Sequence, residues 1–377
     1  QDMRKEVFGI FESVLHKILA DLCDALSTLF EDSGQVPALE ELREALHTEL
    51  ASAGPPDDNG RPRVWVDRSF RVAGAGLVVT GTLSGGPISD NEDLMLWPGE
   101  RLLRVRGLQS HDTPVGRLDP GARAALNIVG VDDVARGAML GRPNTFRTSA
   151  RFLADLRLVR NLDGELTSRG AFHLHAGSGA WPVELRIIEP APGGGAVLRR
   201  SRDPIPLHSG DRFVLRETGR RAVIGGGSIL DPDPPHRGPQ LRAAVPMLRD
   251  ALHRHPDAIA DALLAVRGTA QLDELYCDSG GGVPSSTYRA GRLVMAEPTA
   301  REIHRDIVGA LSKYHRENRL RPGMPKAALS STLRVDPHSA AALIAGSDEI
   351  VDDGATIRLG EFSPGLNPEE QTAWDAA

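Results

Sequence analysis

The sequence is poor in the residues and patterns that many enzyme classes require. Only two of its 377 residues are cysteines, and Cys23 and Cys277 are too far apart to have the spacing of metal ligands. The twelve histidines form no H-E-x-x-H motif, and no G-x-S-x-G motif occurs. These absences exclude a disulfide framework and the common hydrolase signatures. So few cysteines are typical of a reducing compartment, and we expect a cytoplasmic protein.

Long apolar runs are also missing. No stretch approaches the roughly twenty apolar residues that a membrane-spanning helix needs. The sequence also shows no charged and then apolar leader followed by a cleavage site. We therefore expect neither a membrane span nor a secretory signal.

Lysine is scarce, and nearly all basic residues are arginine. The charge is unevenly distributed along the sequence. The formal net charge of −7 divides into −9 for residues 1–60, +5 for residues 61–236 and −3 for residues 237–377. A basic middle between acidic ends indicates weakly that the middle binds an anionic partner.

The glycine-rich stretch FRVAGAGLVVTGTLSGG, residues 70–86, raises the question of a nucleotide site. A phosphate-binding glycine loop must open a helix, but here the β-branched run after Gly76 alternates as a strand does. A P-loop also needs a Gly-Lys pair, and the sequence has none. Gly74, Gly76 and Gly81 are therefore predicted to shape β-turns and strands.

Hydrophobic periodicity predicts the N-terminal organisation. Apolar residues at steps of three and four predict an amphipathic leader helix within residues 1–37, with a stripe formed by Phe8, Phe11, Leu15, Ile18, Leu22, Ala25 and Leu29. Residues 38–60 are predicted to contain a second, shorter helix and a linker rich in Pro, Asp and Gly. We expect the leader to pack on its own domain or on a second copy.

From residue 61 onward the pattern predicts a mixed, mainly β fold. Short strands between Gly and Pro turns predict two consecutive β-barrels, over residues 61–142 and 143–236. Helices followed by short β-rich segments then predict α/β winged-helix modules over residues 237–299 and 300–364, with a truncated third module over 365–377. In the second barrel His173 and His175 share one face of a strand, and without nearby Cys or carboxylates they are predicted to be structural.

Several stretches together resemble a known family. They are VDRSFRVAGAGLVVTGTLSGG (66–86), RVRGLQS (104–110), GARAALNIVGVDDVARGAML (121–140), GDRFVLR with IGGGSILDP (210–232), YHRENRLRPGMPKAAL (314–329) and GLNPEEQTAW (365–374). They are similar to domains II and III and the winged-helix modules of the bacterial selenocysteine-specific elongation factors, the SelB family. The resemblance covers roughly residues 38–377.

The resemblance implies a function in translation. It implies that the two barrels bind selenocysteyl-tRNA for selenocysteine incorporation at UGA codons, with the ribosome as a partner. In the family, a GTPase domain binds GTP and Mg²⁺, and the last winged-helix modules bind the selenocysteine-insertion hairpin of the mRNA. The P-loop, the N-K-x-D motif and the switch regions of that GTPase domain do not occur in these 377 residues. We therefore expect no cofactor and no catalysis from this chain alone.

The resemblance also implies an aminoacyl pocket. The residues that match it are Asp67, Arg68 and Arg123. Guanidinium groups favour a charged selenolate over the neutral hydroxyl of serine, and a carboxylate can orient them or bind the α-amino group. In the alternative interpretation, Asp67 and Arg68 pair with each other at the start of a strand and Arg123 is an ordinary exposed barrel residue.

Two other functions remain open at this point. The chain could be an accessory subunit of a translational GTPase whose nucleotide domain is supplied by another chain. It could also be a winged-helix regulator that binds nucleic acid, although its best candidate recognition segment, residues 324–346, has few basic residues.

Overall fold

The computed structural model describes residues 43–44, 47–48, 56–159, 166–188, 194–199, 203–219, 222–236, 238–285, 287–333, 337–366 and 372. The chain divides into two compact units, Gln1–Asp58 and Asn59–Ala377. In the first unit residues 43–44 and 47–48 are helical, inside the predicted second helix. The predicted leader helix lies outside the described residues, as does nearly all of the predicted third module. The predicted barrels and winged-helix modules fall in the second unit.

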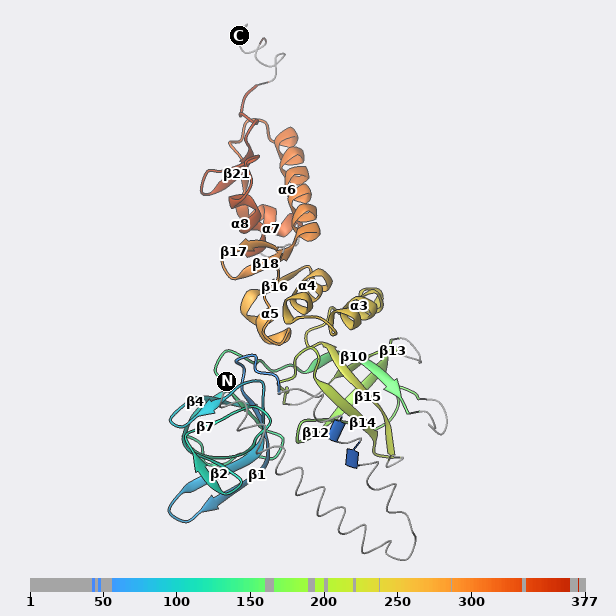
Figure 1. Ribbon diagram of the computed structural model, residues 1–377. Coiled ribbons are helices and arrows are strands. Elements are labelled where there is room, and N and C mark those ends of the chain that lie inside the picture. The colour runs from blue at the N-terminus through green and yellow to red at the C-terminus, as the bar shows by residue number, and fades with distance from the viewer. Residues whose placement is uncertain are drawn as a thin grey trace, which may run out of the picture. The chain divides into compact units, whose positions relative to one another are not determined.

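Antiparallel strands close the first barrel (Figure 1). Their order is β4 (Asp93–Trp97), β9 (Met139–Gly141), β1 (Arg63–Val72), β2 (Gly76–Ser84), β8 (Arg123–Val129) and β5 (Arg101–Ser110), and β5 pairs back with β4. β6 (Thr113–Val115) pairs antiparallel with the end of β5, and β3 (Ile88–Ser89) pairs with β7 (Arg117–Leu118). Alternate residues such as Val64, Val66, Leu126 and Ile128 point inward and are almost fully buried, as the period of two requires.

The glycines of the first barrel shape its backbone, as the sequence predicts. β1 and β2 form a hairpin in which Val72 pairs with Gly76, and Gly74 and Gly76 have φ values of +81° and +95°. At Gly81 a Cβ atom would lie 2.3 Å from the Trp65 carbonyl oxygen, so only glycine fits beside β1. A strand follows this loop, and the prediction of turn and strand glycines is confirmed.

The second barrel is also closed. Its strand order is β10 (Arg151–Leu158), β13 (Gly194–Arg199), β12 (Gly179–Ile187), β11 (Phe172–Ala176), β14 (Arg212–Glu217) and β15 (Ala222–Asp231). Its interior is filled by Phe152, Phe172, Leu174, Leu198 and Leu215, among others. The run of three glycines in β15 lets neighbouring strands approach closely, because a Cβ at Gly227 would lie 1.7 Å from the Asp155 carbonyl oxygen.

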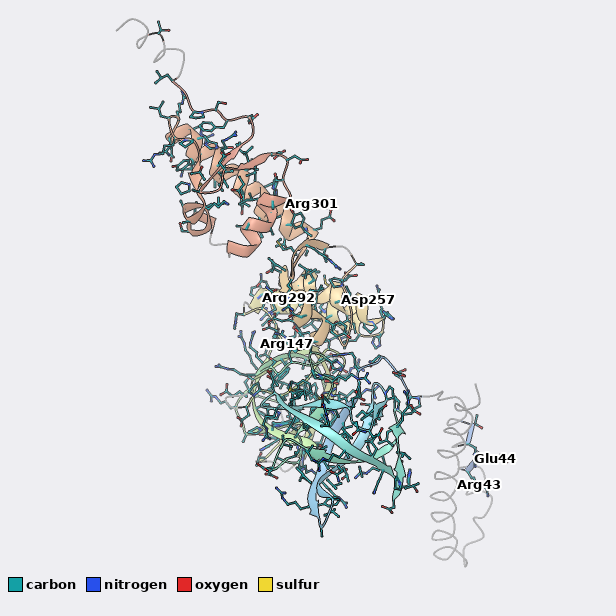
Figure 2. All side chains as sticks on the ribbon, turned by 90° about the vertical axis from the view of Figure 1, so that its left-hand side faces the viewer. Arg43, Glu44, Arg147, Asp257, Arg292 and Arg301 are labelled. Atoms are coloured by element: carbon teal, nitrogen blue, oxygen red, sulfur yellow. The ribbon has the colours of Figure 1, made fainter. Side chains whose placement is uncertain are left out.

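Two winged-helix modules come after the barrels (Figures 1 and 2). The first contains α3 (Gly238–Ala251), α4 (Pro256–Arg267), β16 (Thr269–Gln271), α5 (Leu272–Asp278), β17 (Thr287–Ala290) and β18 (Leu293–Ala296). The second contains α6 (Glu297–Glu317), β19 (Met324–Pro325), α7 (Lys326–Leu333), α8 (Pro337–Ala345), β20 (Ile350–Asp352) and β21 (Thr356–Leu359). Each has a three-stranded sheet, in which β17 pairs with β18 in the first module and β20 pairs with β21 in the second. The predicted boundary between residues 299 and 300 falls inside α6.

The first module shares a hydrophobic core with the second barrel. Leu241, Val245 and Leu248 of α3 join Leu153 and Val197 of the barrel in one buried cluster. The contact is close, because a Cβ at Gly195 of β13 would lie 2.5 Å from the Val245 Cγ2 atom. The outer face of this barrel is therefore partly covered by α3.

In the described part of the chain, no helix is long and apolar enough to cross a membrane.

Candidate functional site

The barrel topology places the three predicted pocket residues on two strands that are separated by one other strand. Asp67 and Arg68 lie in the middle of β1, Arg123 is the first residue of β8, and β2 runs between the two strands. The pairing of β1 with β2 steps from Val66 directly to Arg68, so Asp67 is the extra residue of a β-bulge. A bulge changes the direction of a side chain, and here it brings Asp67 into contact with Arg123.

Asp67 is the centre of this cluster. The Arg123 Nη1 group donates to Asp67 Oδ2, and the Thr80 hydroxyl of β2 donates to Oδ1 at 2.6 Å. The Asp67 side chain is 24% exposed and that of Arg123 is 46% exposed. Arg68 is exposed, and within the described residues it makes no hydrogen bond or ion pair. Both carboxylate oxygens of Asp67 therefore accept a hydrogen bond. The Arg123 guanidinium is held in place by this contact, and the Arg68 guanidinium remains exposed.

The electrostatics keep the Asp67 carboxylate ionised. Burial raises its pKa, but hydrogen bonds from Thr80 and Arg123 and the positive charges of Arg123 and Arg68 outweigh burial and lower the pKa below its ordinary value. Two guanidiniums and one carboxylate leave one net positive charge at the surface. An exposed ion pair of this kind contributes at most about 1 kcal/mol to stability, so its main effect is to orient Arg123.

The alternative interpretation is wrong about the pairing of Asp67 and Arg68, although Arg123 is an exposed barrel residue as it expected. It has Asp67 paired with Arg68 at the start of a strand, whereas both residues lie in the middle of β1 and the ion pair joins Asp67 to Arg123. Thr80, which holds the second carboxylate oxygen, was missed. It could have been found only from the β1–β2 register, in which Thr80 is opposite Arg68.

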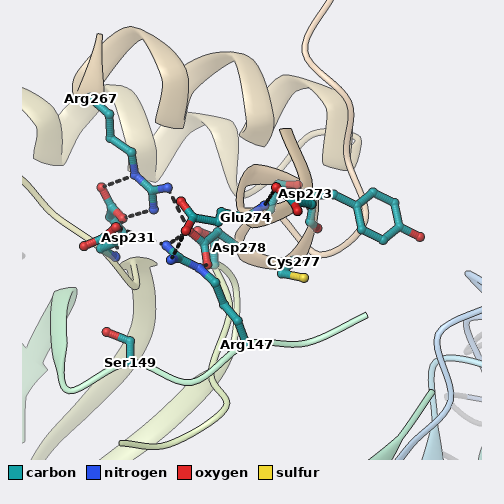
Figure 3. A network of polar contacts seen from close by, with 12 residues as sticks. Arg147, Ser149, Asp231, Arg267, Asp273, Glu274, Cys277 and Asp278 are labelled. Atoms are coloured by element: carbon teal, nitrogen blue, oxygen red, sulfur yellow. Dashed lines mark hydrogen bonds and ion pairs between the residues drawn. The ribbon is translucent and has the colours of Figure 1, made fainter. Parts of the chain in front are cut away.

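A second polar cluster lies at the junction of the barrels with the first winged-helix module, and sequence reasoning missed it (Figure 3). Arg147 comes from the segment between the barrels, Asp231 ends β15, Arg267 ends α4 and Asp278 ends α5. No motif spacing relates these positions. Only the fold brings them together.

The distances in this junction cluster, defined as Arg147, Asp231, Arg267 and Asp278, are short. Arg147 Nε donates to Asp278 Oδ1 at 2.6 Å, and a second Arg147 nitrogen reaches Asp278 Oδ2. Arg267 donates to Asp278 Oδ2 at 2.7 Å and to Asp231 Oδ1 at 2.5 Å. The side chains of Asp231, Asp278 and Arg267 are 0%, 1% and 8% exposed, so these three are removed from water, whereas Arg147 is 24% exposed.

The two arginines of the junction cluster are held in their charged forms. Burial lowers the pKa of Arg267, but the charges and hydrogen bonds of Asp231 and Asp278 outweigh burial and raise it above its ordinary value. Burial likewise lowers the pKa of Arg147, but the hydrogen bonds and the charge of Asp278 outweigh burial and raise it. Gly268, with a φ of +80°, ends α4 directly after Arg267 and fixes the position of that side chain.

A third cluster joins the two barrels. Arg63 of β1 donates to both carboxylate oxygens of Asp211, at 2.6 and 3.0 Å, and to the Pro206 carbonyl at 2.8 Å. His208 lies beside this pair, and burial lowers its pKa. Arg63 holds the pKa of Asp211 below its ordinary value although burial raises it. The pair is therefore ionised and the imidazole beside it is neutral near pH 7.

The two histidines on β11 are partly exposed. The His173 ring is 3.0 Å from the Thr218 hydroxyl, and burial together with Arg216 lowers the pKa of His175. Within the described residues no cluster of three His, Cys, Asp or Glu side chains has the arrangement of a metal site. Their structural role remains a prediction.

Comparison with known proteins agrees with this fold. A family model described as "Elongation factor SelB, winged helix" matches residues 308–359, which include most of the second module. The selenocysteine-specific elongation factor of Escherichia coli K12 is 25% identical over 331 residues, covering 84% of this chain and 53% of that protein. The corresponding factor of Desulfomicrobium baculatum is 32% identical over 201 residues, covering 52% and 32%. The chain is a SelB homologue.

A solved structure extends the match of this SelB homologue across both barrels and modules. The crystal structure of the bacterial selenocysteine-specific elongation factor EF-Sec superposes with a TM-score of 0.69 at 18% identity, covering 90% of this chain and 56% of that chain. The predicted fold of β-barrels followed by winged-helix modules is confirmed. The homologue spans about half of the length of its Escherichia coli relative.

Proposed function

We propose that this chain forms part of a selenocysteine-specific elongation factor and that its first barrel binds the aminoacyl end of selenocysteyl-tRNA. The cluster of Asp67, Arg68 and Arg123 carries the proposal. In it the Arg123 guanidinium is fixed by the Asp67 carboxylate, and the Arg68 guanidinium beside it is exposed. The cluster lies on the barrel that, by the family resemblance, holds the aminoacyl pocket. The names of the homologous factors support the same function.

The proposed pocket selects by charge. A selenol is ionised at neutral pH, whereas the hydroxyl of serine, which the same tRNA carries before conversion, is neutral. Arg123 is oriented by Asp67 before the ligand arrives, so little side-chain freedom is lost on binding. Arg68 then supplies a second donor, and no carboxylate among the described residues forms an ion pair with it.

The remaining partners follow from the same proposal. GTP and Mg²⁺ are bound outside these 377 residues, and the ribosome receives the tRNA. The winged-helix modules connect the barrels to further modules that bind the mRNA hairpin. A translation factor with these partners acts in the cytoplasm.

The test compares one tRNA body carrying selenocysteine or serine. A hydrogen bond between charged groups contributes on the order of 1.5–3 kcal/mol, so Arg123→Ala should weaken binding of selenocysteyl-tRNA about ten- to a hundredfold. Binding of seryl-tRNA should change little. All dissociation constants are measured at one salt concentration, because salt alone shifts nucleic-acid affinity.

Arg104→Ala is the matched control. Arg104 is also an exposed barrel arginine that binds an aspartate, with 2.7 Å between Arg104 Nε and Asp93 Oδ1, but it lies on β5. It should leave both affinities unchanged. If Arg123→Ala weakened the binding of seryl-tRNA and selenocysteyl-tRNA equally, Arg123 would be a contact to the tRNA backbone, and the proposed pocket would be contradicted.

A further inference from the structure

The second barrel carries a cavity on its outer face that the aminoacyl pocket does not involve. It has a volume of about 300 Å³ and is lined by Arg151, Glu184, Leu185, Arg186, Val197, Arg199 and His236. This volume is at the lower end of ligand-sized pockets. The lining residues carry three guanidiniums and one imidazole but only one acidic side chain.

The strand register explains why the arginines gather. Arg199 of β13 is directly opposite Arg151 of β10 on one side and opposite Glu184 of β12 on the other. Residues that are directly opposite share a face, so these three side chains form a row across the outside of the barrel. Arg186, two residues after Glu184, adds a fourth charge on the same face.

One wall of the cavity comes from the segment that leads to α3. Arg151 donates to the carbonyl oxygens of Pro234 and Pro235, with 3.0 Å to the latter, and this ties residues 234–236 to the barrel. His236 completes the lining. Leu153 and Val197 on the same outer face are already covered by α3, so the cavity lies at the edge of that contact.

The local charges are not balanced by the described part of the protein itself. Burial, Arg186 and Arg199 lower the pKa of Arg151, although Asp231 and Asp233 oppose this. Asp231 is bound by Arg267, and Asp233 accepts from Arg147 at 3.2 Å, so both carboxylates are engaged elsewhere. Arg186 and Arg199 are exposed, and within the described residues neither forms an ion pair. Like charges directly opposite each other reduce stability, and an anion between them would relieve the repulsion.

We propose that this cavity, between β10, β13, β12 and residues 234–236, is a binding site for a phosphate group. The three arginines and the glutamate together give a net charge of +2, which matches a phosphate dianion better than a carboxylate. Arginine forks also bind phosphate oxygens in a bidentate manner. The phosphate can belong to an RNA backbone or to a free or small-molecule phosphate. The site stands independently of the aminoacyl pocket, which lies on the other barrel.

The first arm of the test uses inorganic phosphate and the full chain. Arg186→Ala and Arg199→Ala should each weaken phosphate binding about ten- to a hundredfold in calorimetry at low ionic strength. Arg212→Ala is the control, because Arg212 is an exposed arginine of β14 on the same barrel and does not line the cavity. Arg199→Lys, which keeps the charge but loses the fork, should give an intermediate loss.

Thermal unfolding separates loss of binding from loss of folding. Phosphate stabilises the folded state by mass action, so it should raise the melting temperature of the wild type and of Arg212→Ala above that in chloride of equal ionic strength. The two cavity variants should fold with unchanged or higher melting temperatures in chloride and show no additional increase in phosphate.

The second arm identifies the source of the phosphate with a short RNA duplex of unrelated sequence. If the phosphate belongs to RNA, the cavity variants should bind the duplex more weakly and lower the slope of log affinity against log salt by about one. If only inorganic phosphate binding is lost, the ligand is a free or small-molecule phosphate. If the cavity variants match Arg212→Ala in the phosphate arm, the proposal is overturned.

Discussion

Asp67 in the first barrel and Asp278 at the junction both bind arginine side chains, and they differ in exposure. Asp67 is 24% exposed and its partner Arg123 is 46% exposed. Asp278 is 1% exposed and is shared by Arg147 and Arg267, whose side chains are 24% and 8% exposed. Water can therefore reach both members of the Asp67–Arg123 pair, whereas Asp278 and Arg267 are almost entirely removed from water.

This difference assigns different tasks to the two clusters. Breaking an exposed pair costs little, and its free guanidinium surface remains available to a ligand. Breaking a buried pair leaves an uncompensated charge in a medium that solvates it poorly. We therefore expect the junction cluster to fix the first winged-helix module to the barrels and the Asp67 cluster to bind.

The largest expected effect is at Asp278. Asp278→Ala leaves the buried Arg267 and the partly buried Arg147 without their shared carboxylate, and it should lower the free energy of unfolding by about 3–5 kcal/mol. Denaturant titration of the full chain, followed by tryptophan fluorescence and circular dichroism together, measures this loss. Asp93→Ala, which removes an exposed partner of Arg104, is the control and should have no measurable effect. A similar midpoint for the two variants would remove the distinction between the clusters.

An intermediate effect is expected at His208, a partly buried group beside the Arg63–Asp211 pair. Its pKa is lowered in the folded state, mainly by burial and also by Arg63 and Arg61, although Asp211 and the Ser209 carbonyl oppose this. The folded state therefore binds this proton less readily than the unfolded state, whose pKa is about 6.5. Its stabilising effect is complete above pH 6.5 and decreases as the pH falls below that value.

The size of this decrease has an upper limit of about 1.4 kcal/mol per pH unit for one group. Carboxylates contribute their own acid sensitivity, so the comparison is between the wild type and His208→Gln, which cannot titrate. Unfolding free energies between pH 7.5 and 5.5 should fall less steeply in the variant. Parallel curves would show that His208 is not desolvated as described.

The smallest effect on stability is expected at Thr80, whose hydroxyl holds Asp67 Oδ1 at 2.6 Å. Thr80→Val keeps the shape and removes that hydrogen bond, at a cost of about 0.5–1.5 kcal/mol. The pKa of Asp67 should rise toward its ordinary value, since this hydrogen bond is one of the causes that lower it. An NMR titration of the Asp67 carboxyl measures the shift. No rise would show that Arg123 alone fixes the carboxylate.

The sequence predicts the regular parts of this molecule well because their signals are local. The turn glycines Gly74 and Gly76 and the alternation of buried residues along β1 and β2 specify a hairpin within a few residues. The bulge at Asp67 cannot be predicted in this way, because it appears only in the register between two strands. The Arg123 partner requires the further knowledge that β2 lies between β1 and β8.

The junction cluster was beyond sequence reasoning for a related reason. Its bonded members are 11 to 131 residues apart and come from a linker, a strand and two helices, so no periodicity or spacing connects them. The arginines of the phosphate cavity are similar, because Arg151 and Arg199 become neighbours only through the pairing of β10 with β13. Such clusters follow from topology and not from motifs.

The central claim is that guanidiniums on the first barrel recognise the charge of the aminoacyl group. The most direct measurement is the ratio of dissociation constants for seryl- and selenocysteyl-tRNA on the same tRNA body, in the wild type and in the double variant Arg68→Ala/Arg123→Ala. The account predicts a ratio of at least about ten for the wild type and a ratio near one for the double variant. A wild-type ratio near one, or a large ratio that survives the loss of both arginines, would contradict it.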